Sequence, residues 1–144
     1  MTVERRRFVG ASPRRLLAAL RLILGGVAYV APRTAARAFA IDPDEAAAMP
    51  SAIRLFGARE LVLGVGIIGR RTDSMRWLVL GTVADSLDLL TVGLGLRANR
   101  LNPATAAISA VMAGSAVGLG LTALRERAGF TPASGNEPAI HATS

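Results

Sequence analysis

The apolar run PATAAISAVMAGSAVGLGLTAL, residues 103–124, constrains the fold more than any other part of this 144-residue chain. None of its residues is charged. As an α-helix rising 1.5 Å per residue it would be about 33 Å long, which matches a bilayer hydrocarbon core of about 30 Å. Asn102 is a good N-cap residue, and Pro103 suits the first helical position. The run therefore predicts a membrane-spanning helix.

Three further apolar segments, residues 13–31, 51–69 and 75–96, have similar lengths. Ser12 is the expected N-cap of the first segment, and Asp73 or Ser74 that of the third. We therefore expect an all-α fold, a bundle of four transmembrane helices within residues 13–127. A soluble four-helix bundle is the alternative, because three segments contain ionisable residues. However, none of the four shows the polar stripe that the surface of a soluble bundle needs.

The two ends of the chain differ in composition from these segments. Residues 1–12 form a basic segment, and residues 128–144 are predicted to be a disordered tail. The sequence RRRFV at residues 5–9 resembles a twin-arginine export signal. Further arginines interrupt the apolar run that follows it, and no small-residue cleavage site comes after that run. We therefore expect no cleaved signal.

Arginine accounts for all 17 basic residues of the chain, whose net charge is +7. Ten arginines lie on one side of the predicted bundle: Arg5, Arg6, Arg7, Arg14, Arg15, Arg70, Arg71, Arg76, Arg125 and Arg127. The other side has only four: Arg33, Arg37, Arg97 and Arg100. The positive-inside rule therefore places both termini in the cytoplasm. Arginine without lysine in an Ala- and Gly-rich chain is typical of a GC-rich bacterial genome, so the expected location is the bacterial cytoplasmic membrane.

The longest connection between predicted spans, residues 32–50, contains the sequence Asp42-Pro43-Asp44-Glu45. An N-cap Asp followed by Pro and, three residues on, by Glu predicts the start of a short helix. Apolar residues precede it, so this segment could lie flat at the outer membrane surface.

Ionisable residues inside the predicted spans are the candidate site. Arg59 and Glu60 lie about 12–14 Å below the outer face, and Asp88 lies level with them on the next span, at 1.5 Å per residue. Asp85 is one turn away on the same helix face as Asp88. Unpaired charges at this depth are costly, so we expect these four side chains to face inward and pair.

The expected positions of two more arginines follow from their depth in the membrane alone. Arg21 lies near enough to the cytoplasmic face for its side chain to reach the interface. Arg54 lies nearer the outer surface, and could share the cluster as an additional cation. The cluster is interpreted either as an interhelical ion-pair network that fixes packing, or as a site for a proton, a cation or a polar ligand.

Several classes of site are excluded by composition. The chain has no Cys, and its one His is His141, near the C-terminus. Disulfides, thiol nucleophiles, b-type haem, zinc hydrolysis and His-based triads are therefore excluded from the predicted bundle. We expect no cofactor and no metal site. Short arginine clusters beside apolar runs, with only six aromatic residues, argue against nucleic acid as a partner.

Small residues recur in the last span at four-residue spacing: Ala106, Ala110, Gly114 and Gly118. Such ladders permit close helix contact in membranes. The ladder is interpreted either as packing within the chain or as the face of a homo-oligomer. Gly57, Glu60 and Gly64 likewise share one face of the second span.

The segment GARELVLG at residues 57–64, with ADSLD at 84–88, resembles small four-helix integral membrane proteins that are loosely DoxX-like. In that group an Arg-Glu pair and an apolar, Gly-containing stretch occupy the second helix, and an acidic residue occupies the third. The resemblance covers roughly residues 14–125 and implies a four-helix membrane fold. It implies nothing firm about chemistry, although some relatives are linked to quinone or redox partners.

Three hypotheses about function follow. The first is a non-enzymatic scaffold or accessory subunit, with the lipid bilayer and a homo-oligomer or another membrane protein as partners. The second is an oligomeric transporter or proton-coupled component that uses Glu60, Asp85 and Asp88. The third is a membrane enzyme acting on lipid or quinone, with a carboxylate as acid or base.

Overall fold

The computed structural model describes residues 12–69 and 71–129 of the chain. Within these residues all regular secondary structure is helical, as predicted. The helices are α1 (Pro13–Val30), α2 (Pro32–Ala38), α3 (Pro43–Ala48), α4 (Pro50–Ile68), α5 (Arg71–Arg97) and α6 (Pro103–Ala128). The predicted basic segment, apart from Ser12, and nearly all of the predicted tail lie outside the described residues.

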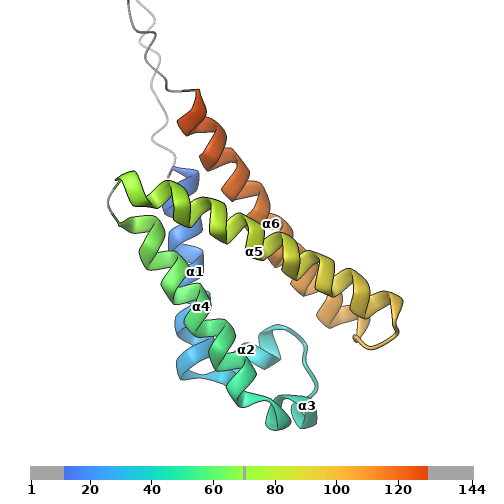
Figure 1. The fold of residues 1–144 in the computed structure, drawn as a ribbon. Helices are drawn as coiled ribbons and strands as arrows, with labels where there is room; N and C mark the ends of the chain where they lie inside the picture. The colour runs from blue at the N-terminus through green and yellow to red at the C-terminus, as the bar shows by residue number, and fades with distance from the viewer. Residues whose placement is uncertain (1–11, 70, 130–144) are drawn as a thin grey trace, which may run out of the picture.

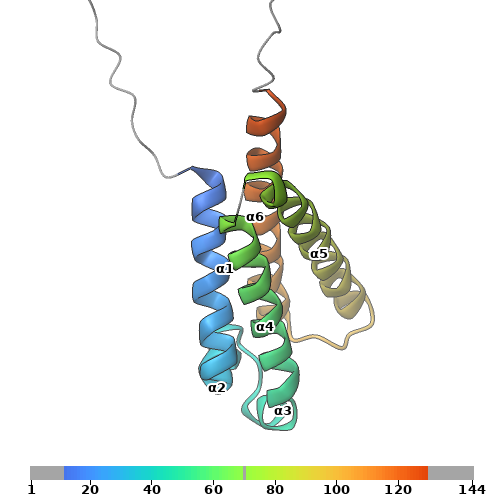
Figure 2. The same cartoon turned by 60° about the vertical axis from the view of Figure 1, so that its left-hand side comes forward.

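The four long helices form two pairs (Figures 1 and 2). Helix α1 packs along α4, and α5 packs along α6. The two pairs cross near the α4–α5 turn and diverge toward the opposite end, where α2 and α3 connect α1 to α4. The start of α1, the α4–α5 turn and the end of α6 therefore lie at one end of the structure.

Side-chain capping explains where three of the six described helices begin. Oxygens of Ser12, Asp42 and Asn102 accept hydrogen bonds from backbone N–H groups of α1, α3 and α6, as predicted. Pro32 ends α1 and also occupies the first position of α2, a short helix that the sequence analysis did not separate from the connection.

The start of α5 differs from the prediction. The helix begins at Arg71, so Asp73 and Ser74 lie in its first turns and do not cap it. Ser74 is fully buried. At the same end, the Arg14 guanidinium donates to the carbonyl oxygen of Ile67 from Nε (2.9 Å) and Nη2 (2.7 Å). This contact satisfies a carbonyl group that the end of α4 leaves open.

Helices α1 and α4 approach closely because glycines face each other. A Cβ on Gly57 would lie 2.7 Å from the backbone nitrogen of Tyr29 and 2.8 Å from the carbonyl oxygen of Gly25. No side chain fits at this crossing, so the two backbones are in contact. Gly57, Glu60 and Gly64 are all buried, which confirms that they share the packed face of this helix.

The ladder of small residues on α6, unlike the glycines of α4, does not stay on the packed face of its helix. Ala106 is buried, Ala110 is half-buried, and a Cβ on Gly118 would have no atom within 4 Å. A four-residue step turns 400° around a helix, so the ladder rotates by about 40° per step away from the packed face. The packed face of α6 follows Ala106, Gly120 and Ala123 instead.

A small apolar core lies where the two helix pairs cross. It contains Leu17 and Ala18 of α1, Ile67 of α4, Leu78 of α5 and Ala123 of α6. Outside this core, most of α5 and α6 is exposed and apolar. Among the described residues, these are the two helices that are long and apolar enough to cross a membrane, and only 22% and 17% of their most apolar segments is buried.

Candidate functional site

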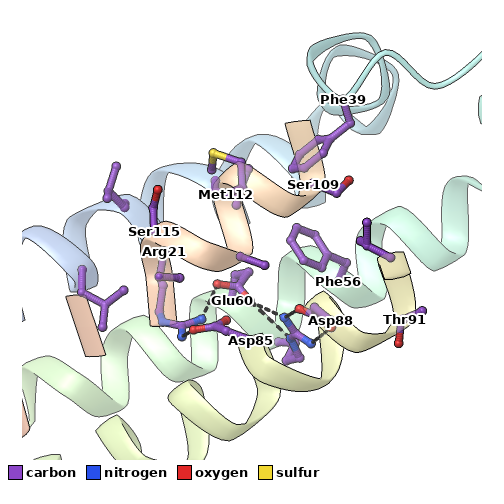
Figure 3. Close-up of a pocket in the computed structure, with 17 residues that line it drawn as sticks. Arg21, Phe39, Phe56, Glu60, Asp85, Asp88, Thr91, Ser109, Met112 and Ser115 are labelled. Carbon is purple, nitrogen blue, oxygen red and sulfur yellow. Dashed lines mark hydrogen bonds and ion pairs between the residues drawn. The ribbon is translucent and has the colours of Figure 1, made fainter. Parts of the chain in front are cut away.

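Five charged side chains from three helices form a continuous chain of ion pairs (Figure 3). The order is Asp85–Arg21–Glu60–Arg59–Asp88, with Arg21 on α1, Glu60 and Arg59 on α4, and both aspartates on α5. The N–O distances are 2.6 Å for Asp85–Arg21, Arg21–Glu60 and Arg59–Asp88, and 2.8 Å for Arg59–Glu60. The structure thus brings together all four residues of the predicted cluster.

Arg21 lies at the centre of this chain, and the prediction that it reaches the cytoplasmic interface is wrong. Its side chain is 2% exposed, and it donates from Nη1 to Glu60 and from Nη2 to Asp85. Gly81 on α5 makes room for the guanidinium, because a Cβ there would lie 2.8 Å from Nη2.

Two sequence signals could have identified Arg21. It lies four residues after Leu17 and four before Gly25, both buried, so it occupies the packed face of α1. In addition, the predicted cluster contains one arginine and three carboxylates. A second cation was therefore needed to reduce its excess negative charge. The residue suggested for that role, Arg54, is exposed and donates from Nε to the carbonyl oxygen of Tyr29 (3.3 Å).

Arg59 pairs with Asp88 as predicted, through both terminal guanidinium nitrogens. Nη1 donates to Oδ1 (3.1 Å) and Nη2 to Oδ2 (2.6 Å) of Asp88. This two-point geometry fixes the relative orientation of α4 and α5. The Arg59 guanidinium also lies 5.3 Å from the ring centroid of Phe56, a cation–π contact.

A cavity of about 410 Å³ lies directly against this network. The five charged side chains line one part of it, and the rest of the lining is mainly apolar. The remaining residues are Leu17, Leu20 and Leu24 of α1, Phe39, Phe56, Thr91, Val92, and Ser109, Met112, Ala113, Ser115 and Ala116 of α6. The cavity thus lies between the two helix pairs and takes its lining from both.

Phe39 lines the cavity from the segment after α2. Its ring meets the ring of Phe56 edge to face, with centroids 6.2 Å apart. The next residue, Ala40, has a positive φ of 52°, and its carbonyl oxygen accepts a hydrogen bond from Thr105 Oγ1 (2.8 Å). This bond connects the segment to the start of α6 and so positions Phe39. The sequence analysis did not identify Phe39 or Phe56 as site residues.

Not every polar atom at the cavity is paired. Both carboxylate oxygens of Glu60 and of Asp88 accept hydrogen bonds from arginine. Asp85 uses only Oδ2, and its Oδ1 has no hydrogen-bond partner among the described residues. Among the three carboxylates of the network, Asp85 alone therefore has an oxygen without a hydrogen bond, and Asp85 lines the cavity.

No protein-family model matches this chain, and no curated protein or solved structure is significantly similar to it.

Proposed function

We propose that this chain is a small, non-enzymatic integral membrane protein that binds a small molecule in its central cavity, alone or as an accessory subunit. In this proposal α1, α4, α5 and α6 cross the bacterial cytoplasmic membrane, and both termini are cytoplasmic. The observation that carries the proposal is the chain of five ion-paired residues beside a mainly apolar cavity.

The positions of the charges support four spans. Helices α1 and α4 each contain three charged residues, but Arg21 and Glu60 are buried against each other. The surfaces that these two helices turn outward are apolar, with Val30 80% and Leu55 73% exposed. In water such exposed apolar surfaces would favour aggregation, whereas in a bilayer they contact lipid.

The arrangement of the ends supports the proposed topology. The start of α1, the start of α5 and the end of α6 lie together. Among the described residues, six arginines belong to these helix ends: Arg14, Arg15, Arg71, Arg76, Arg125 and Arg127. The opposite end holds α2, α3 and the α5–α6 turn. Four crossings together with the positive-inside rule support a cytoplasmic location for the arginine-rich end.

The cavity supports binding of a small molecule. A volume of about 410 Å³ lies within the range of about 300–1,000 Å³ that small-molecule sites occupy. The walls are mainly apolar, and the few polar groups are held in place by ion pairs. This is the combination that orients a ligand without large rearrangement of the protein.

A transporter is the second candidate, favoured by one observation. The ion pairs Arg21–Asp85 and Arg59–Asp88 join the α1–α4 pair to α5, so movement of one helix pair against the other would open the site. Ligand uptake into vesicles containing the purified protein would support this candidate, and binding without uptake would favour the first.

Native mass spectrometry tests the binding proposal on protein purified in mild detergent from its own membrane. We expect the wild type to retain a small ligand and the cavity-filling variant Ala113→Phe to lose it. Ala107→Phe is the matched control, because Ala107 is exposed on the same helix and does not line the cavity. Equal occupancy in the wild type and both variants, or no ligand in the wild type, would overturn the proposal.

A further inference from the structure

The charges around the cavity do not balance. Two guanidinium groups face three carboxylates, which leaves one negative charge in excess when all five groups are ionised. In apolar surroundings an uncompensated charge is costly. Among the described residues no further arginine lines the cavity.

Hydrogen bonding locates the excess charge at Asp85. Glu60 and Asp88 each accept arginine hydrogen bonds on both oxygens, whereas Asp85 accepts only one, from Arg21 to Oδ2. Asp85 is 4% exposed and lines the cavity. Figure 3 shows it beside Arg21 and Glu60. Its Oδ1 is therefore an anionic acceptor that a ligand in the cavity can reach.

One donor is also unused, but a ligand cannot reach it. Among the side-chain nitrogens and oxygens of the described residues that are themselves fully buried, Arg21 Nε alone has no hydrogen-bond partner, whereas the unpaired Asp85 Oδ1 is not fully buried. A Cβ on Gly81 would lie 3.6 Å from this atom, so it lies against the backbone of α5. The charged group offered to a ligand is thus an acceptor, and the complementary ligand group is a donor with positive charge.

The other cavity walls define the rest of the ligand. On α1 the lining runs from Leu17 to Leu24, and on α5 from Asp85 to Val92, eight residues in each case. The seven helical steps between the first and last residue span about 10.5 Å, which is the approximate length of the cavity. Nine of the twelve lining residues outside the ion-paired chain are apolar. The described residues also contain no group of three or more His, Asp or Glu that could hold a metal ion, so the site suits an organic cation.

We propose that the cavity binds a lipophilic ammonium compound, whose positively charged group donates to Asp85 Oδ1 and whose apolar body lies along α1 and α6. This inference rests on the proposed function, because it names the class of molecule that the cavity binds. Intramembrane carboxylates commonly act as counter-ions in this way.

Decylammonium is a suitable probe, with decanoate and decanol as controls that have the same alkyl chain. Binding is measured by equilibrium dialysis on the full-length protein in phosphatidylcholine nanodiscs. We expect decylammonium to bind more tightly than either control. Asp85→Asn should weaken its binding at least about tenfold, because a charge-assisted hydrogen bond is lost. Asp44→Asn, on exposed α3, is the matched control and should leave binding unchanged.

Ala113→Phe keeps the experiment decisive if Asp85→Asn does not fold, since it closes the cavity and leaves the charges intact. It should abolish decylammonium binding. Tighter binding of decanoate would overturn the inference. Loss of binding in Ala113→Phe but not in folded Asp85→Asn would also overturn it, while leaving the proposed function standing.

The ammonium group could belong to a free amine or to a lipid headgroup. Replacing phosphatidylcholine with phosphatidylethanolamine in the nanodiscs distinguishes these sources. Competition by this lipid would assign the site to its headgroup, whereas undiminished decylammonium binding would assign it to a free amine.

Discussion

Replacing Arg21 by Met should destabilise this protein more than any other single arginine substitution in the described residues. Methionine keeps much of the apolar stem of arginine and removes its charge. Asp85 then loses its only hydrogen-bond partner, and Glu60 loses one of two arginine partners. Both carboxylates stay buried at that point, with side chains only 5% exposed.

The expected loss follows from the burial of these groups. Removing one partner of a buried ion pair costs about 3–5 kcal/mol, because it leaves an uncompensated charge away from water. Arg21 forms ion pairs with two carboxylates, but in the Arg21→Met variant Glu60 keeps its ion pair with Arg59. We therefore expect the free energy of unfolding to fall by at least about 3 kcal/mol.

Reversible unfolding by dodecyl sulfate in mixed micelles is the assay. Trp77 is the only Trp of the chain and packs against the core, so its fluorescence reports on the contact between the helix pairs. Circular dichroism follows helix content independently. Arg15→Met is the matched control, because Arg15 is exposed on the same helix, and it should change the unfolding midpoint little.

A double-mutant cycle separates pairing from other effects of the substitution. In the Asp85→Asn background, Arg21→Met should cost less than in the wild type, with a coupling energy above about 1 kcal/mol. The reasoning would be refuted if the two losses were additive. It would be refuted equally if Arg21→Met cost no more than Arg15→Met.

Three further outcomes follow from the structure. Arg59→Ala should destabilise the protein more than Arg59→Ala combined with Asp88→Ala, measured by the same unfolding assay; additive losses would exclude this pairing. Gly57→Ala should lower the free energy of unfolding by more than about 2 kcal/mol, since its Cβ would meet backbone atoms of α1. The control Gly26→Ala should not lower it, because no atom lies within 4 Å of the new Cβ. Ala40→Gly should stabilise by about 1 kcal/mol, because φ is 52° there; a lower unfolding midpoint would contradict this explanation.

The helical architecture could be predicted because local signals agree with one another. Four apolar segments of similar length, three N-caps and prolines at helix starts all predict the same elements. The start of α5 was misplaced because the helix begins at Arg71, before its apolar segment. Local sequence contains little information about such an early start.

The candidate site was predicted in part, since depth along a helix follows from residue number. That calculation placed Arg59, Glu60 and Asp88 at one level. It could not show that Arg21 completes the network, because Arg21 meets Glu60 and Asp85 only through the crossing of α1, α4 and α5. The crossing depends on Gly25, Gly57 and Gly81, whose role is a property of tertiary packing.

The cavity itself could not be predicted, because it is formed by the divergence of the two helix pairs. Phe39 reaches it from a connection that the sequence analysis placed only at the membrane surface. Side chains that line a space between helices share no sequence spacing, so no pattern search would group them.

Single-cysteine labelling tests the central claim most directly, namely that four helices cross the membrane around this network. The chain has no Cys, so Asp44→Cys on α3 and Asp73→Cys at the start of α5 each introduce a single reactive site, and both positions are exposed. A membrane-impermeant maleimide should label Asp44→Cys in intact spheroplasts and Asp73→Cys only after permeabilisation. Labelling of both positions from the same side would show that α4 does not cross, and would contradict the account.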